Sequence, residues 1–174
     1  LYMRNTKPNI LIINDGNRRW AKERNLSIRD GYREMVKKIA FLCDDLKHKG
    51  FEKVYITLCS VSNLARPKEE VAIFYDEYLA TADLSKNKIR IELHGNLNLI
   101  PEHFKNKYEL LVEKTAENTD FTLHFMVNWS LDDEFVRIFN RLQSSHSKIT
   151  EEILKENSDI KDTIDLIIRT GNRK

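Results

Sequence analysis

The chain has 174 residues, of which 41% are hydrophobic, so it has the size of one compact domain and not of two independent ones. Its 29 basic and 27 acidic side chains nearly cancel, which argues against a nucleic-acid binder but leaves room for a local anion pocket. No stretch reaches the roughly 18 apolar residues that span a bilayer, and the N-terminus lacks the run of a signal peptide. We therefore expect a cytoplasmic protein whose contact with a membrane is at most peripheral.

Five short apolar runs with β-branched character predict buried strands, at residues 9–14, 53–59, 88–93, 121–127 and 164–168. Between these runs the apolar residues recur at helical spacing, which predicts helices. One helix has an apolar face formed by Tyr32, Met35, Ile39, Leu42 and Leu46, and the others fall within residues 67–82, 101–117 and 131–143. This alternation is typical of a single α/β domain with a mainly parallel sheet and helices on both faces. Ligands of such sheets bind at the carboxyl ends of the strands.

The segment that follows the first strand, Asp15–Ala21 (DGNRRWA), is rich in groups that bind phosphate. Gly16 allows the backbone to approach a ligand closely, and Arg18 and Arg19 offer paired donors to phosphate oxygens. Asp15 would oppose an anion unless a divalent cation lay between them, and Mg²⁺ typically bridges a carboxylate to substrate phosphates. The segment suggests a Mg²⁺–diphosphate site, although Asp15 as a helix cap and solvated arginines would explain it equally well.

Two other strand ends carry similar side chains. The second strand leads into Ser60, Asn63, Arg66 and Glu70, and the last one into Arg169 and Gly171. Capping and the helix dipole alone could account for the second of these segments. However, if these strands are neighbours, their ends open onto one crevice, and polar side chains at each end favour a common anion site there. No GxGxxG or GxxxxGK[ST] motif supports a dinucleotide or P-loop site.

The cysteines and histidines show no metal-ligand spacing. Cys43 and Cys59 are expected to be buried, reduced thiols. We expect the histidines to be scattered over surface or satisfied structural positions: His48, His94, His103, His124 and His146.

Together these segments resemble the cis-prenyltransferases, the family of undecaprenyl- and dehydrodolichyl-diphosphate synthases. The family stretch DGNxRWA matches Asp15–Ala21. The pattern SxxNxxRPxxE stands as Ser60, Asn63, Arg66, Pro67 and Glu70, NTxxTL as Asn118, Thr119, Thr122 and Leu123, and DLxIRTG as Asp165, Leu166 and Ile168–Gly171. Order and approximate spacing agree over nearly the whole chain.

The resemblance implies a Mg²⁺-dependent enzyme, usually a homodimer, that binds allylic and homoallylic prenyl diphosphates. Asp15 would hold Mg²⁺, and catalysis would fall to Asp15, Asn17, Ser60 and Asn63. Arg169 would hold the homoallylic diphosphate. The full set of expected substrate-binding residues is Gly16, Arg18, Arg19, Trp20, Tyr32, Arg66, Glu70, Arg169 and Gly171.

Several departures from the family pattern bear on the reaction. Tyr32 follows Gly31 where the family usually has His, and the SxENW pattern has become Ser62–Leu64. The GGExRxSNF pattern reads Gly171–Lys174 and then stops, so we expect native residues beyond Lys174 in this single domain of residues 1–174. The missing stretch would supply the second Arg and the Ser of the homoallylic site and a later acidic Mg²⁺ ligand.

The segment after Glu70 is short for the helix that walls the product tunnel of long-chain members. We therefore expect cis condensation of isopentenyl diphosphate with an allylic diphosphate to a short product. Two alternatives are a head-to-middle condensation of dimethylallyl diphosphates, as in lavandulyl diphosphate synthase, and a non-catalytic partner subunit. The partner-subunit alternative is less well supported, because such partners typically lose the Asp of the first loop, and Asp15 is present here.

Overall fold

The computed structural model describes residues 7–79, 88–143 and 148–171. Within them the chain forms a five-stranded sheet in the order β3-β4-β2-β1-β5, and every neighbouring pair is parallel. The strands are β1 (Ile10–Ile13), β2 (Lys53–Thr57), β3 (Ile89–Gly95), β4 (Phe121–Val127) and β5 (Leu166–Arg169). The predicted α/β class is confirmed, and each predicted strand is present with its ends shifted by at most two residues.

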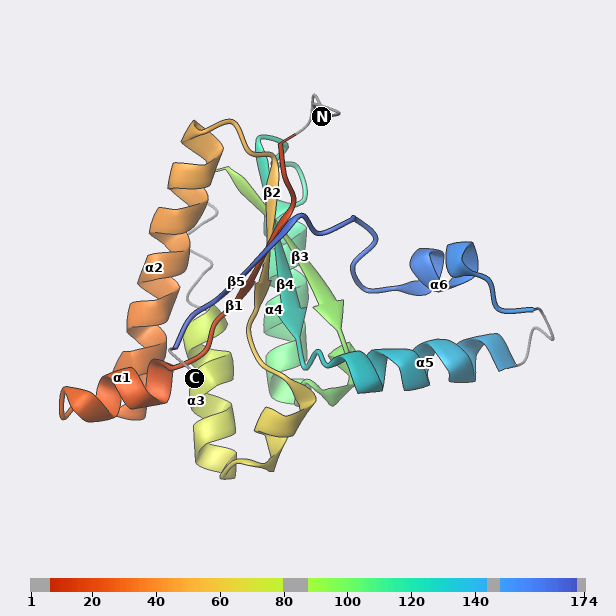
Figure 1. The fold of residues 1–174 in the computed structure, drawn as a ribbon. Coiled ribbons are helices and arrows are strands. Elements are labelled where there is room, and N and C mark those ends of the chain that lie inside the picture. Colours follow the sequence, from red (N-terminus) through yellow and green to blue (C-terminus); the bar gives the residue numbers. More distant parts are fainter. Residues whose placement is uncertain (1–6, 80–87, 144–147, 172–174) are drawn as a thin grey trace.

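The helices alternate with the strands along the chain (Figure 1). They are α1 (Asn17–Glu23), α2 (Ile28–His48), α3 (Lys68–Leu79), α4 (Glu102–Thr115), α5 (Leu131–Gln143) and α6 (Glu151–Asn157), with short 3-10 turns η1 (Val61–Ala65) and η3 (Leu97–Leu99). The predicted helix over 67–82 begins one residue later, and its residues 80–82 lie outside the described part. Helix α6, which was not predicted, begins where Thr150 accepts a hydrogen bond from the Ile153 amide.

Alternation along the strands separates two layers of side chains. On β1, Ile10 and Ile12 join the main core with α2, α3 and α4, whereas Leu11 faces the other side of the sheet. There Leu11 packs with a smaller group that includes Tyr55 and Met126. Helices α5 and α6 project from this second side in Figure 1, opposite α2.

The prediction of five buried strands is wrong for β5. Leu166, Ile167 and Ile168 are all exposed, because β5 pairs with β1 alone and no described helix packs closely on it, whereas α4 covers the other edge strand, β3. The prediction for the thiols is confirmed, since Cys43 and Cys59 are free and buried. Among the described helices, none has the length and apolar character that crossing a bilayer requires.

Candidate active site

The carboxyl ends of β1 and β2 open onto a cavity of about 730 Å³. Its walls come from the loop after β1, from α1, from the start of α2, and from η1 and α3. Several of the predicted site residues line it: Asp15, Gly16, Asn17, Arg18, Arg19, Tyr32, Asn63 and Arg66. Two separate strand ends thus contribute to one hollow, as expected for a parallel sheet.

Glycines allow the loops after β1 and β5 to pass backbone against backbone. Gly16 has φ of 100°, and a Cβ there would lie 2.8 Å from the Cα of Gly171. Gly171 has φ of 85°, and its Cβ would lie 2.5 Å from the carbonyl oxygen of Asp15. Any other residue at either position would force the loops apart. The same contact brings Arg169, at the end of β5, next to Asp15.

Three charged side chains, Asp15, Arg19 and Arg169, form what we call the rim. Arg169 Nη2 donates to Asp15 Oδ2 at 2.8 Å, and Arg19 Nη2 lies 3.5 Å from Asp15 Oδ1. Arg19 Nη2 also donates to the carbonyl of Gly171 at 2.5 Å. All three side chains are partly exposed, at 24% for Asp15 and about half for the arginines. The rim therefore presents one carboxylate between two guanidinium groups to solvent.

A second set of polar groups, the Glu70 cluster, comprises Arg18, Tyr32, Arg66 and Glu70. Arg66 Nη1 donates to the Tyr32 hydroxyl at 2.7 Å and to Glu70 Oε1 at 3.1 Å. Arg18 Nε lies 3.3 Å from the same carboxylate oxygen, and the Tyr32 hydroxyl donates to it at 3.4 Å. Glu70 is buried and does not line the cavity, so it orients the arginines from beneath. Burial raises the pKa of Tyr32 to about 12, which keeps the phenol protonated.

The inner end of the cavity, which we call the floor, is formed by Leu58, Phe74 and Tyr78. Phe74 and Tyr78 are each 1% exposed, and their rings lie 6.2 Å and 6.1 Å from the Tyr32 ring. The Tyr78 hydroxyl donates to the Leu58 carbonyl at 2.7 Å. These residues were not among the predicted site residues, although Phe74 and Tyr78 share one helical face at i, i+4. An apolar group attached to an anion held at the rim would meet this aromatic end.

The structure places several predicted residues elsewhere. Trp20 lines a second cavity of about 720 Å³ between α2 and the β1–β5 edge, where the Arg24 guanidinium stacks 4.6 Å from its ring. Gly171 also lines that cavity. Ser60 is outside the lining of the first cavity. Its hydroxyl shares a 2.8 Å hydrogen bond with Ser62, and its amide donates to Asn63 Oδ1 at 3.1 Å.

The sequence resembles those of known isoprenyl transferases. The chain is 27% identical to an isoprenyl transferase of Campylobacter jejuni over 98% of its own length and 79% of that protein. It is 33% identical to an isoprenyl transferase of Fusobacterium nucleatum, with coverage of 97% and 76%.

Two solved structures share the fold. One is a probable undecaprenyl diphosphate synthase from Campylobacter jejuni, with a TM-score of 0.74, 23% identity and coverage of 98% of this chain and 78% of that one. The other is lavandulyl diphosphate synthase from Lavandula x intermedia in complex with dimethylallyl diphosphate, with a TM-score of 0.85, 19% identity and coverage of 97% and 79%. The undecaprenyl diphosphate synthase family model matches residues 13–174, so the chain belongs to this family of prenyl-transferring enzymes.

Proposed function

We propose that this chain condenses isopentenyl diphosphate with an allylic diphosphate in cis, giving a short prenyl diphosphate. The observation that carries the proposal is the cavity itself, which is lined by Asp15 and Arg19 of the rim and by the floor residues Leu58, Phe74 and Tyr78, while Arg169 lies next to Asp15. A prenyl diphosphate has the matching polarity, because a multiply charged head is joined to an apolar tail. The rim would hold the head while the tail points toward Phe74 and Tyr78.

The donor set at the rim fits Mg²⁺. Magnesium is typically bound by one or two carboxylates together with substrate phosphates, and Asp15 offers the carboxylate at the cavity. Arg19 and Arg169 flank that carboxylate, so phosphate oxygens that pair with the guanidinium groups would lie beside it. When bound, Mg²⁺ supplies positive charge that stabilises a leaving diphosphate.

The remaining roles follow from position. Arg18, Arg19 and Arg66 would hold the allylic diphosphate, and their donors would stabilise the negative charge that develops on it as the allylic C–O bond breaks. Arg169, on β5, would hold the homoallylic diphosphate. Asn63 lines the cavity and would orient the reacting carbons or assist proton removal. Ser60 would act there only after its hydroxyl turns from Ser62.

The floor supports a short product. Phe74 and Tyr78 line the cavity and are almost fully buried, so a growing prenyl tail would meet their rings. Residues 80–87, which complete the segment predicted to be short, lie outside the described part of the chain.

One experiment tests the reaction and its product together. The protein is incubated with Mg²⁺, isopentenyl diphosphate and dimethylallyl, geranyl or farnesyl diphosphate, and the products are identified by mass spectrometry. We expect a cis product extended by few isoprene units, and none when EDTA replaces Mg²⁺. A branched product from dimethylallyl diphosphate alone would instead establish the head-to-middle reaction. Calorimetry that finds no Mg²⁺-dependent binding of an allylic diphosphate would indicate a non-catalytic subunit.

We also propose a homodimer. Helix α5 exposes four apolar side chains, Leu131, Phe135, Val136 and Phe139, which a second copy would cover. Light scattering coupled to size exclusion would measure the mass, and Phe135→Ser with Phe139→Ser should shift it toward the monomer. A cytoplasmic location and peripheral contact with a membrane also stay predictions.

A further inference from the structure

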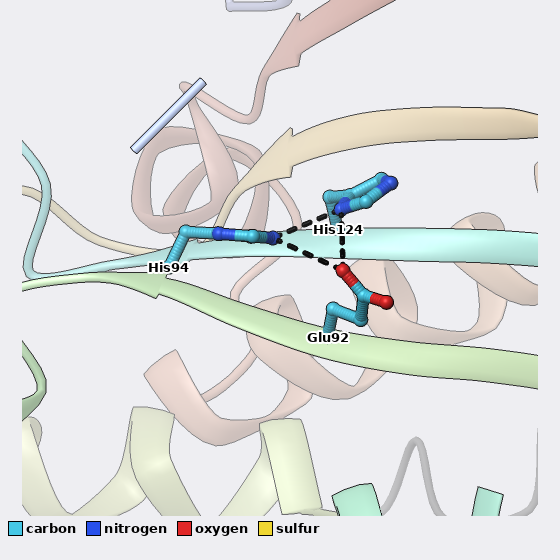
Figure 2. A group of neighbouring side chains, drawn as sticks. All are labelled: Glu92, His94 and His124. Atoms are coloured by element: carbon cyan, nitrogen blue, oxygen red, sulfur yellow. Dashed lines mark hydrogen bonds and ion pairs between the residues drawn. The ribbon is translucent and has the colours of Figure 1, made fainter. Parts of the chain in front are cut away.

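Three side chains that bind metals in many proteins meet on the sheet face away from the main core. Glu92 and His94 stand two residues apart on β3, so both point to the same face. His124 is on β4, and the parallel register pairs it with Glu92. Figure 2 shows the two imidazole rings and the carboxylate converging. Because one member comes from a different strand, no sequence spacing reveals the group.

The distances fit a tetrahedral metal ion. His94 Nε2 lies 2.9 Å from His124 Nδ1, and Glu92 Oε2 lies 3.4 Å from His124 Nδ1 and 3.7 Å from His94 Nε2. Bonds of about 2.0–2.2 Å, as zinc makes to His and Glu, separate neighbouring ligand atoms by about 3.3–3.6 Å in a tetrahedron. The three observed separations bracket this value. Only small side-chain movements would be needed to accept an ion.

The hydrogen bonding within the group also favours a bound metal ion. A single proton shared between His94 Nε2 and His124 Nδ1 explains their contact, but it leaves Glu92 Oε2 facing them at 3.4 Å or more. A cation at the centre would satisfy the two ring nitrogens and the carboxylate together.

Surrounding residues hold the three ligand atoms in place. Arg90 Nε binds the other carboxylate oxygen of Glu92 at 2.9 Å, which leaves Oε2 toward the rings. The Tyr55 ring stacks on His124 with centroids 4.4 Å apart. Tyr55 and Lys53 both donate to Asp162, so Lys53 is already paired with a carboxylate. Such outer contacts are what orient the ligands of known metal sites.

We propose that Glu92, His94 and His124 bind a divalent transition-metal ion of the Zn²⁺ class, with water as the fourth ligand. Imidazole favours zinc, nickel, copper and iron, whereas Mg²⁺ prefers oxygen, so this site is distinct from the rim in its chemistry. The Glu92 and His94 side chains are 32% and 25% exposed, which leaves access for the ion and the water. The bound ion would tie β3 to β4 and add to stability without entering the prenyl transfer.

The test uses metal-stripped protein. Calorimetry measures the binding of Zn²⁺, and visible absorption measures the binding of Co²⁺. We expect one ion per chain and a Co²⁺ spectrum of tetrahedral type. At a Zn²⁺ concentration a hundredfold above the dissociation constant, the melting temperature should rise by about 5–10 °C. Mg²⁺ at the same concentration should cause no such rise.

Four variants locate the binding. His94→Gln and Glu92→Gln, at partly exposed positions, should each weaken Zn²⁺ binding at least tenfold while the circular dichroism stays unchanged. His103→Gln, at an exposed histidine on α4, and Asp15→Asn, at the rim, should bind as the wild type does. The proposal is overturned if the wild type binds no Zn²⁺ or if His94→Gln and Glu92→Gln bind it normally. Because none of these readouts depends on prenyl transfer, they stand apart from the test of the proposed function.

Discussion

The rim and the floor of the cavity are built in opposite ways. At the rim, Asp15, Arg19 and Arg169 are partly exposed and held by ion pairs that phosphate or metal could replace. At the floor, Phe74 and Tyr78 are almost fully buried in the main core. Exposed ion pairs contribute about 0–1 kcal/mol to stability, whereas burying a large aromatic contributes several times that. Changes at the rim should therefore alter the rate, and changes at the floor should alter stability and product length.

Phe74→Ala should have the largest effect. It removes a ring that is 1% exposed, so the free energy of unfolding should fall by about 3–5 kcal/mol in a denaturant titration. If the variant folds, its products should be longer than those of the wild type, because the floor has been opened. Phe41→Ala is the matched control, since Phe41 is 71% exposed on α2 and should cost little. Unchanged product length in folded Phe74→Ala, or in the milder Phe74→Leu, would contradict the role of the floor.

Asp15→Asn comes next. The amide keeps the shape of the side chain but loses the charge that would hold Mg²⁺, so kcat should fall on the order of a hundredfold, about 2.7 kcal/mol. The free energy of unfolding should change by no more than about 0.5 kcal/mol, because the ion pairs that are lost are exposed. Steady-state kinetics at saturating Mg²⁺ measure kcat, and denaturant titration measures the free energy of unfolding. Asp132→Asn, at an exposed position on α5, serves as the control. A rate above a tenth of wild type would argue against the metal role.

Glu70→Gln sharpens the comparison, because Glu70 is buried and yet acts on groups that line the cavity. Losing the charge should let Arg18 and Arg66 leave their positions, and misplacement of about 1 Å can cost up to about a hundredfold in rate. We expect kcat to fall about tenfold with KM unchanged or lower, since the site loses a negative charge. Glu69→Gln, at the exposed neighbouring position, should leave both constants as they are. A rise in KM alone would mean that Glu70 serves binding and not the orientation of the arginines.

Local patterns predicted the strands of the sheet well. The continuous apolar run with β-branched residues in NILIIN gives β1, and Gly16 between Asp15 and Asn17 indicates a loop that approaches a ligand. What could not be predicted depends on pairing between distant segments. His124 meets Glu92 only through the β3–β4 register, and β5 is exposed because no described helix packs closely on it.

The Glu70 cluster illustrates the same limit within the site. Glu70 was predicted to bind substrate because it matches a family motif. Its burial beneath Arg66 follows from the way α3 packs on α2, which no window of sequence contains.

Tyr32→Phe should have the smallest effect. The phenol accepts a hydrogen bond from Arg66, so its loss should weaken binding of an unreactive allylic diphosphate analogue by about 1 kcal/mol, or about fivefold, in calorimetry. Arg66→Lys keeps the charge but not the planar fork. If Tyr32 acts through Arg66, the double variant that combines Tyr32→Phe with Arg66→Lys should bind the analogue no more weakly than the weaker-binding single variant does. Additive losses would instead mean that the phenol contacts the diphosphate itself, because independent interactions add. Unchanged affinity in Tyr32→Phe would leave the phenol with a packing role beside Phe74 and Tyr78.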